Sequence, residues 1–564
     1  MPLAQAREID ACAGLLARLR PLFDQATRSL ALACQENGRF SARRFDERQV
    51  ASYELAWAGA DLLAADTGIQ GLNAASSALE VSLALIFGVD AIGAVLARLE
   101  TLFLELDEDL AVLQAFAADP AWGALRRAAG GSSALQSAGR ALAEADGEVG
   151  GSALDEAHAM AQDAFRRFAA EVVAPQAEAL HRHDLTVPES LLQPLREMGV
   201  FGLSIPERFG GSGPNDHDDT LLMVLVTEAL SEASLAGAGS LITRPEILSR
   251  ALMAGGTEEQ KAHWLPRIAA GAPLCAIAIT EPDYGSDVAS LMLRGTRVDG
   301  GWRLDGAKTW CTFAGKAGLL MVVVRTDPDR SAGHRGLSVM LVEKPSHDGH
   351  AFDFRQEAGQ GGGRLAGKAI PTIGYRGMHS FDLSFENFFV PDSHVVGGHD
   401  GLGKGFYFTM AGMMGGRMQT AGRALGVMRA ALRAALRHVA DRKVFGAPLL
   451  DCPLTLAKLA RMGARHAACQ RLAYAVARTL DAGGGRMEAS LVKLLACRSA
   501  ELVTREALQL HGGMGYAEET PVSRYFVDAR VLSIFEGAEE TLALKVIARS
   551  LVEQALPQAG ADSR

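Results

Sequence analysis

Paired cysteines are missing from this sequence. Its seven cysteines stand singly along 564 residues, and no two of them have the C-x-x-C spacing of a redox or zinc site. An odd, unpatterned set is typical of reduced thiols in the cytosol, where disulfides rarely persist. We therefore predict a cytoplasmic protein with neither a disulfide framework nor a metal site.

Positive charge and long hydrophobic runs are also scarce. The net charge is −10, so the sequence lacks the basic surface that binds nucleic acid. The most apolar run, residues 81–97, is shorter than the roughly 20 residues that span a bilayer and contains Asp90, which predicts a buried helix. The first 20 residues mix charges into an amphipathic pattern unlike a signal peptide. We predict a soluble protein without a nucleic-acid or membrane partner.

Two nucleotide-binding signatures are absent as well. We find no G-x-G-x-x-G between a strand and a helix and no P-loop, which disfavours a Rossmann or NTPase fold.

Proline is rare in residues 9–140, where apolar residues recur at helical spacing, as in Leu15, Leu16 and Leu19. This pattern predicts an N-terminal helical extension over residues 1–150.

Three further segments follow the extension. Residues 151–271 are predicted to be helical, with breaks at Pro175, at Pro188 and at 206–214, and with a helix from Thr257 that Pro266 ends. Residues 272–396 read as a β domain, and residues 397–564 as a second bundle of long helices. The predicted strands are 274–279, 301–304, 319–324, 337–342 and 381–385, and 364–368 is expected to be a surface connection. The predicted fold is mainly α with a central β-barrel domain, preceded by an extra N-terminal helical bundle.

One carboxylate in the last segment has the setting of a general base. Glu536 follows the apolar pair Ile534-Phe535 and precedes Gly537. Removal from water disfavours the charged form of a carboxyl, which suits a base that works near neutrality. The alternative is an acidic residue that merely begins a helix, where the helix dipole favours it.

Five short motifs in order give the sequence a family resemblance. They are Thr280-Glu-Pro with Gly285-Ser-Asp287, Lys308 to Thr312, Arg442 to Gly446, Gln509 to Gly513, and Phe535 to Gly537. Each motif alone is weak, but five at this spacing are specific. From about 152 to 555 the chain resembles the acyl-CoA dehydrogenases, flavoenzymes built of α, β and α domains.

The resemblance implies an FAD site shared between subunits. Its predicted contacts are Ile279, Thr280, Ser286, Trp310, Thr312, Arg442, Phe445, Gln509, Gly512 and Gly513. Trp310 and Thr312 would line the isoalloxazine ring, and Arg442 would grip the pyrophosphate across an interface. Such a site implies a homo-oligomer, either a dimer or a tetramer. Taken singly, these residues fit a plain turn, a core tryptophan, a solvated arginine and a helix C-terminus equally well.

The implied reaction removes two hydrogens from an acyl-CoA thioester. Glu536 would take the proton beside the carbonyl, and the flavin would accept hydride from the next carbon. The Glu536 backbone N–H and a ribityl hydroxyl would stabilise the charge on the thioester oxygen. Some relatives carry the base at the position of Gly416, which has no acid here. Arg417 and Gly537 are further predicted substrate contacts.

The N-terminal extension and the stretch Gly374 to Ser380 indicate which members of the family the chain resembles most. They are similar to family members that oxidise (2S)-methylsuccinyl-CoA to mesaconyl-CoA in the ethylmalonyl-CoA pathway, with electron-transferring flavoprotein as acceptor. A buried carboxylate needs a cation, and we predict Arg244, with Ser240 and Thr243, as its anchor. The alternative for Arg244 is a surface arginine at a helix break. For the extension, the hypothesis is that it packs on the core bundle and replaces a subunit contact or shields the pocket.

Other activities remain open from the sequence. One is dehydrogenation of another short or branched acyl-CoA, and the others are an acyl-CoA oxidase and a DNA-associated flavoprotein. The sequence also departs from the common family pattern. Ala538 and Glu540 stand where many relatives carry threonine and glutamine, and Asp283-Tyr284 replaces a small pair, so those FAD contacts and the width of the entrance are in doubt.

Overall fold

The computed structural model describes residues 3–150, 154–357, 359 and 361–556. The chain divides into two units, one formed by Met1–Ala159 with Val427–Arg564 and the other by Met160–Gly426. The long helix α14 (Gly405–Asp441) contributes to both, because the division falls inside it.

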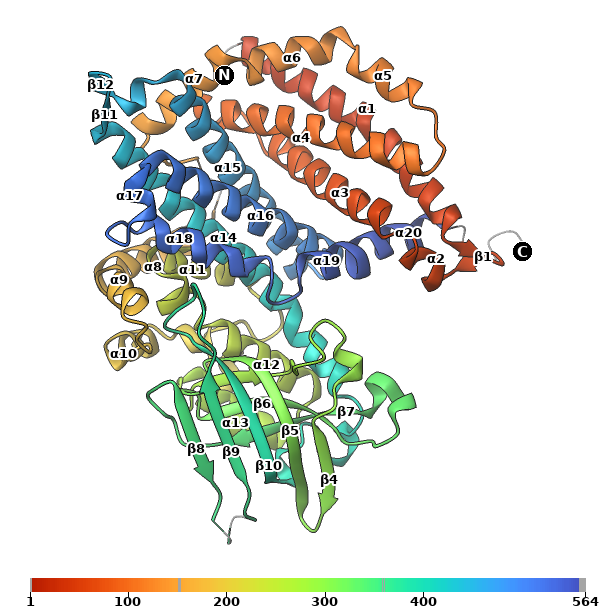
Figure 1. Ribbon diagram of the computed structural model, residues 1–564, viewed down its shortest axis with the longest axis vertical. Helices are drawn as coiled ribbons and strands as arrows, with labels where there is room; N and C mark the ends of the chain where they lie inside the picture. The colour runs from red at the N-terminus through yellow and green to blue at the C-terminus, as the bar shows by residue number, and fades with distance from the viewer. Residues whose placement is uncertain (1–2, 151–153, 358, 360, 557–564) are drawn as a thin grey trace. The chain divides into compact units, whose positions relative to one another are not determined.

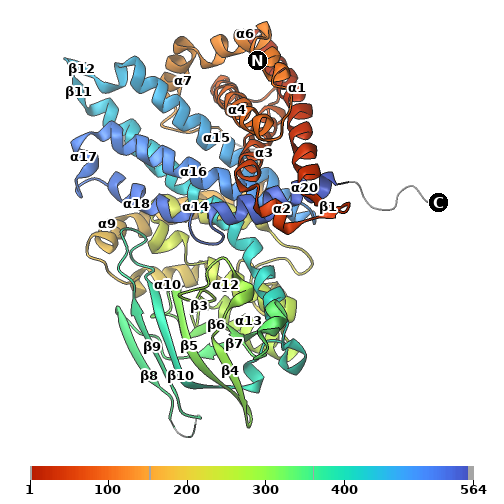
Figure 2. The same cartoon turned by 45° about the vertical axis from the view of Figure 1, so that its right-hand side comes forward.

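The first unit joins the N-terminal extension to the C-terminal helices. The extension comprises α1 (Leu3–Ala33), α2 (Ala42–Asp46), α3 (Gln49–Gln70), α4 (Ala78–Glu105), α5 (Ala111–Ala117), α6 (Pro120–Gly130) and α7 (Ser132–Glu144), with a short hairpin of β1 (Gln35–Glu36) and β2 (Arg39–Phe40). Figures 1 and 2 both show α1, α3 and α4 side by side. The buried faces of α3 and α4 are alanine- and leucine-rich, which allows close helix packing.

The C-terminal part of this unit is also helical. It comprises the end of α14, the hairpin β11 (Lys443–Val444) and β12 (Ala447–Pro448), α15 (Pro453–Asp481), α16 (Arg486–His511), α17 (Gly513–Tyr516), α18 (Val522–Leu532), α19 (Glu539–Thr541), the π-helix Leu542–Ala548 and α20 (Arg549–Ala555). An added Cβ at Gly139 of α7 would lie 2.2 Å from the carbonyl oxygen of Leu456 in α15. The backbones touch there, which confirms that the extension packs on the C-terminal bundle.

The second unit begins with helices. They are α8 (Glu156–Phe168), the π-helix Ala169–Val173, α9 (Ala174–Arg182), α10 (Glu189–Glu197), α11 (Thr220–Ala233), the π-helix Leu235–Gly239, α12 (Thr243–Gly255) and α13 (Glu258–Ala269). Its sheet contains β3 (Cys275–Ala278), β4 (Arg294–Val298), β5 (Gly301–Thr312), β6 (Leu319–Arg325), β7 (Leu337–Glu343), β8 (Ala351–Arg355), β9 (Arg364–Ala369) and β10 (Ser380–Pro391).

The eight strands form one curled sheet (Figure 1). The order is β3-β6-β4-β5-β10-β9-β8, with β7 paired to β6. Strands β5 and β10 are both 12 residues long and pair antiparallel from Gly301 to Thr312. Inward side chains such as Leu304, Phe385 and Phe388 are buried and form the core of the curled sheet. The predicted fold class is therefore confirmed.

Several local predictions were wrong. Residues 364–369 form strand β9, which pairs with β8 and β10, where a surface connection was expected. Strands β4 and β8 were missed: both are only five residues long, and β4 is mostly polar. Pro266 lies inside α13 and Pro175 in the first turn of α9 after a π-helical turn, so neither ends its helix. A proline in a first helical turn loses no hydrogen bond.

Helix α4 is longer than the predicted buried run. Among the described residues, it is the one helix whose length and composition would also allow a membrane crossing, and 67% of its most apolar window is buried. Core helices pass the same test.

Candidate functional site

The loop after β3 carries three of the predicted FAD contacts, Ile279, Thr280 and Ser286. A buried ion pair fixes this loop, because the Lys308 ammonium donates to the Glu281 carboxylate at 2.8 Å and to the Ile279 carbonyl oxygen at 2.8 Å. Glu281 also accepts from the backbone N–H groups of residues 292 and 293 at 2.6 and 2.7 Å. Burial lowers the pKa of Lys308, and the Glu281 carboxylate opposes that effect. Glu281 and Lys308 both belong to motifs of the family resemblance, but no motif indicated that they pair.

Trp310 and Thr312 lie at the end of β5. Trp310 has a positive φ of 56° and is 55% exposed, although it follows a largely buried strand. A positive φ is rare for a bulky residue and marks a position that the surrounding structure holds. Trp310 is therefore no core tryptophan but an exposed ring, as a stacking surface for an aromatic cofactor requires. Thr312 is buried, and its hydroxyl lies 3.0 Å from that of Ser380.

The other predicted FAD contacts lie in the first unit and are all exposed. Phe445 occupies the turn of the β11–β12 hairpin with a φ of 50°, and its ring is fully exposed. Gln509, Gly512 and Gly513 lie where α16 ends, and Gly512 is the cap of that helix with a φ of 59°. Arg442 is exposed beside the hairpin. The helix-end interpretation of the glycines is thus correct, and it leaves their backbone open to a ligand.

The predicted base lies in a turn between α18 and α19. Glu536 has a φ of 53° and Gly537 a φ of 100°, so Glu536 does not begin a helix. The ammonium of Lys493, on α16, donates to the carbonyl oxygens of Phe535 at 3.0 Å and Gly537 at 2.6 Å. The turn is held from both sides of Glu536. Ile534 is 54% exposed and Glu536 is partly exposed, so this unit alone does not desolvate the carboxylate as predicted.

The predicted substrate residues of the second unit surround the start of α12. Arg244 is only 6% exposed, and its guanidinium donates to the carbonyl oxygen of Ser240 at 2.9 Å. Across the described residues, no carboxylate lies within ion-pair distance of Arg244. The Ser240 hydroxyl is buried and has no hydrogen-bond partner among the same residues. The alternative of a surface arginine is therefore wrong.

Two further predicted residues have other surroundings. The Thr243 hydroxyl donates to the Gln419 side chain at 2.7 Å, and Gln419 in turn contacts Glu246, so Thr243 belongs to a buried polar network. Arg417 lies partly exposed on α14.

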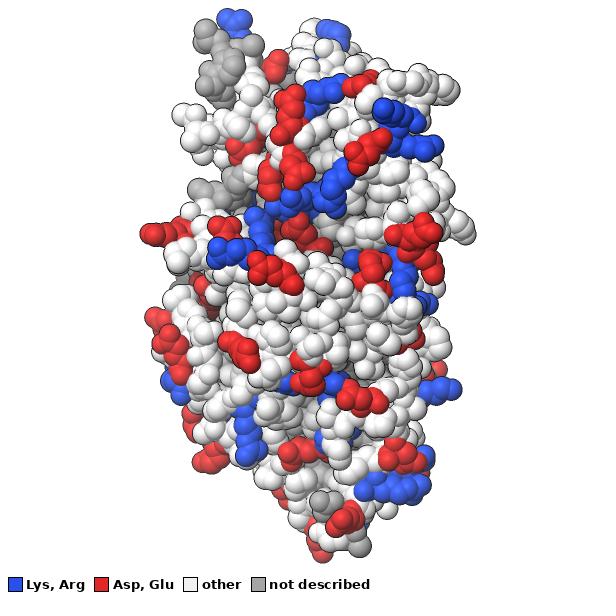
Figure 3. All heavy atoms as spheres, turned by 90° about the vertical axis from the view of Figure 1, so that its left-hand side faces the viewer, with Lys and Arg blue, Asp and Glu red and all other residues white. Residues whose placement is uncertain are grey.

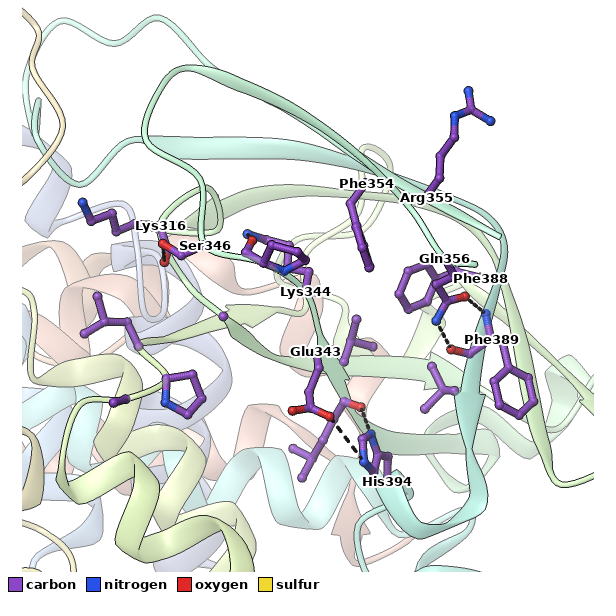
Figure 4. A pocket seen from close by; sticks show the side chains of 18 of the residues that line it. Lys316, Glu343, Lys344, Ser346, Phe354, Arg355, Gln356, Phe388, Phe389 and His394 are labelled. Carbon is purple, nitrogen blue, oxygen red and sulfur yellow. Dashed lines mark hydrogen bonds and ion pairs between the residues drawn. The ribbon is translucent and has the colours of Figure 1, made fainter. Parts of the chain in front are cut away.

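A cavity of about 920 Å³ in the second unit contains none of the predicted site residues. It opens between β7 and β8, each of which pairs with one neighbouring strand. Figure 4 shows Phe354 pointing into it and Arg355 pointing away. Its lysines are already bonded, since Lys344 donates to the Gly315 carbonyl oxygen at 2.7 Å and Lys316 pairs with Asp348.

Two histidines and an aspartate converge elsewhere in this unit. The Nε2 atom of His379 lies 3.1 Å from that of His350 and 3.1 Å from the Asp184 carboxylate. The Arg376 guanidinium lies 3.8 Å from the same carboxylate and supplies positive charge there. Burial lowers the pKa of His379. These contacts join the loop after α9 to the loops before β8 and β10.

Models of three domains of one protein family match this chain. Models of the acyl-CoA dehydrogenase N-terminal, middle and C-terminal domains match residues 155–272, 276–388 and 403–552. The chain belongs to the acyl-CoA dehydrogenase family. It is an oxidoreductase that acts on acyl-CoA, and members of the family are FAD-dependent flavoproteins.

Individual proteins of known activity or known structure are also similar to this chain. The chain is 41% identical over 406 residues, 72% of its length and 71% of the relative's, to a (2S)-methylsuccinyl-CoA dehydrogenase of Cereibacter sphaeroides. Among solved structures, butyryl-CoA dehydrogenase of Megasphaera elsdenii is 28% identical with a TM-score of 0.64, and covers 71% of this chain and 99% of its own. A chain from a structure of the electron transferring flavoprotein of Acidaminococcus fermentans is 27% identical with a TM-score of 0.63, and covers 72% and 99%.

The residues present fit FAD. A Cβ added at Gly512 or Gly513 would meet no atom within 4 Å, so a large group can approach the backbone there. Trp310 offers an exposed ring for a flavin, and Arg442 an exposed guanidinium for a pyrophosphate. These residues would hold the cofactor.

Proposed function

We propose that this dehydrogenase oxidises a short, branched acyl-CoA with a second carboxylate, converting (2S)-methylsuccinyl-CoA to mesaconyl-CoA. The similarity to the Cereibacter sphaeroides enzyme supports this substrate. The N-terminal extension also supports it, because the extension is one of the two features by which the sequence resembles family members that oxidise this substrate.

Arg244 is the observation that carries the proposal. A guanidinium that is 6% exposed and has no described carboxylate beside it leaves a buried positive charge without a counter-charge. Burying an unpaired charge is costly, so such a group is expected to receive an anion during function. The buried Ser240 hydroxyl, four residues earlier, supplies a second donor for the same anion. The thioester of a monocarboxylic acid, such as butyryl-CoA, has no carboxylate to offer there.

The chemistry of the substrate explains why this position matters. In a succinyl thioester the second carboxylate is bonded to the carbon that loses hydride. Holding this carboxylate therefore fixes the orientation of the reacting C–H bond, which is a large part of catalysis by positioning.

Glu536 acts as the base in this proposal. It takes the α-proton, and the backbone N–H of Glu536 donates to the thioester oxygen as charge develops there. FAD, when bound, supplies the hydride acceptor. The Lys493 contacts on either side of Glu536 fix the backbone that carries this carboxylate, in a conformation with a positive φ.

Electron-transferring flavoprotein is the proposed acceptor, and a homo-oligomer the proposed assembly. The family match and the relative from the Acidaminococcus fermentans structure support the acceptor. The exposed Phe445, Met514 and Tyr516 support the assembly, because large apolar side chains in open solvent are expected to be covered. On the face drawn in Figure 3, basic side chains are interspersed with acidic ones, so this face gives no support to a DNA-associated flavoprotein.

Replacement of Arg244 tests the substrate. Arg244→Ala is expected to lower kcat/KM for (2S)-methylsuccinyl-CoA by about 10²-fold or more, because breaking a buried charge pair costs about 3–5 kcal/mol. Activity on butyryl-CoA, which has no second carboxylate, should stay within about 3-fold of the wild type. Stopped-flow bleaching of the flavin under anaerobic conditions measures both.

Two controls separate the chemistry from the substrate. Glu536→Gln should abolish bleaching with every acyl-CoA while flavin stays bound. Equal losses on both substrates in Arg244→Ala would contradict the carboxylate anchor, and bleaching by butyryl-CoA alone would keep the family but discard the proposed substrate. Stoichiometric hydrogen peroxide release in air would indicate an oxidase instead.

A further inference from the structure

A second carboxylate, Glu539, lies three residues after Glu536 and is buried at 7% exposure. Two donors hold it, from different parts of the chain. Arg498 of α16 binds it with two nitrogens, one of them at 3.2 Å, and the hydroxyl of Tyr53 donates to it from α3 of the N-terminal extension. Tyr53 and Glu539 are 486 positions apart in the sequence.

Glu539 also closes the turn that contains Glu536. Its backbone N–H donates to the Ser533 carbonyl oxygen at 3.0 Å, so residues 533–539 form a loop with both ends joined. Lys493 fixes the middle of this loop through the carbonyls beside Glu536, and the Glu539 side chain fixes its end. Glu536 sits between the two attachments.

The N-terminal extension also contacts Arg498. The guanidinium of Arg498 lies over the ring of Trp57, 5.3 Å from its centroid, and that of Arg98 in α4 lies 5.4 Å from the same centroid. A guanidinium over an indole ring is favourable. Tyr53 and Trp57 lie one turn apart on α3, so one face of this helix contacts both partners of the Glu539 ion pair.

We propose that Tyr53 is a positioning residue for Glu536: by binding Glu539, it makes the N-terminal extension part of the support of the catalytic turn. The proposal rests on the proposed role of Glu536. It gives the extension a task in catalysis in addition to its packing on the bundle. Tyr53 and Glu539 touch no reacting atom in this account, and they act through the conformation of residues 533–539.

Removing the Tyr53 hydroxyl tests the proposal in the full-length holoenzyme. Tyr53→Phe deletes one oxygen, and we expect the rate of flavin reduction by saturating acyl-CoA to fall by about 10-fold, because small misplacements of a reacting group are costly. The dissociation constant of the substrate should change by less than about 3-fold. Glu539→Gln reaches the same turn by an independent route and should give a loss of the same kind.

Glu80→Gln is the matched control. Glu80 of α4 pairs with Arg471 of α15 at 2.8 Å, and both side chains are about as buried as Glu539, so this pair also joins the extension to the bundle. Within the described residues, Glu80 bonds to Ser77 and Arg471 and not to residues 533–539. Glu80→Gln should leave the reduction rate unchanged, although it removes an equivalent link.

Hydrogen exchange supplies a readout that needs no substrate. Amides of residues 533–541 should exchange about 10-fold faster in Tyr53→Phe and Glu539→Gln, and at the wild-type rate in Glu80→Gln. Unchanged exchange in Tyr53→Phe would overturn the proposal, as would a reduction rate equal to that of Glu80→Gln. If Glu536→Gln still bleaches normally, the proposed base fails, and exchange alone then decides whether Tyr53 holds the turn.

Discussion

At the scale of single residues, backbone conformation marks the predicted site. Trp310, Phe445 and Glu536 were each predicted from motifs, and each has a positive φ that its side chain disfavours. Such conformations persist only where neighbouring contacts hold them. For Glu536 the holding contact is Lys493, which is 1% exposed and which no sequence motif indicated.

Lys493 gives a prediction at this scale. Lys493→Met keeps the length of the side chain but removes both hydrogen bonds to the carbonyls beside Glu536. We expect the rate of flavin reduction to fall by about 10- to 100-fold, because the base loses its fixed orientation. The melting temperature should also fall, since hydrogen bonds to a charged group contribute about 1.5–3 kcal/mol each. Stopped-flow and thermal melts measure the two effects.

Lys493→Arg is the conservative comparison for this variant. It restores the charge and donors, and partial recovery of the rate is expected. A wild-type rate in Lys493→Met would show that the turn is held without this ammonium.

At the scale of elements, the extension helices carry a buried charge of their own. Asp61 of α3 is 8% exposed and lies 3.6 Å from the guanidinium of Arg98. Burial raises the pKa of Asp61 to about 6, although Arg98 and Arg465 oppose the shift. The folded state therefore binds a proton more tightly than the unfolded chain, whose aspartates have a pKa of about 3.9.

Asp61→Asn should reveal this cost as pH rises. Because the pKa of Asp61 is raised in the folded state, the free energy of unfolding of the wild type falls as pH rises from about 4 through about 6. The full loss is present at pH 8. The free energy of unfolding of Asp61→Asn, relative to the wild type, should increase by about 1–2 kcal/mol between pH 5 and pH 8, since one pKa unit is about 1.4 kcal/mol. Chemical denaturation at both values measures it. A difference independent of pH would contradict the assignment.

At the scale of the whole molecule, the predicted FAD contacts divide between exposed and internal positions. Phe445, Gln509, Gly512 and Gly513 lie on the surface of the first unit. Gly513 has open space above it and contributes nothing to the packing of one chain, whereas Gly512, with its positive φ, also ends α16. The open surface above Gly513 is expected to matter only when FAD and a second copy cover it, as the family resemblance implies.

Gly513→Asp tests this expectation. An added side chain at Gly513 meets no atom of its own chain within 4 Å, so folding should be unaffected, whereas a new negative charge repels a pyrophosphate. We expect the purified variant to lose most of its FAD and to shift toward smaller assemblies in analytical ultracentrifugation. Gly14→Asp is the control, because Gly14 is exposed on α1 and equally free of neighbours. Full FAD content in Gly513→Asp would contradict the predicted contact.

The sequence by itself determined the family, the fold class and most long elements, because these depend on local patterns. Helical periodicity identified the C-terminal bundle that contains α15 and α16, and uninterrupted apolar runs identified β6 and β7. Motif order predicted Glu536 and the loop after β3. Strands β4, β8 and β9 were missed or misassigned because their partners, and not their own residues, make them strands.

Only the tertiary structure decided how these residues are held. The Lys308–Glu281 pair and the Lys493 contacts join residues that are far apart in the sequence. The burial of Arg244 without a described carboxylate has no periodic signal in the sequence either. The link from Tyr53 to Glu539 spans almost the whole chain. Sequence patterns report which residues are apolar or small, whereas a buried charge acquires its role from the groups that folding brings, or fails to bring, within a few ångströms of it.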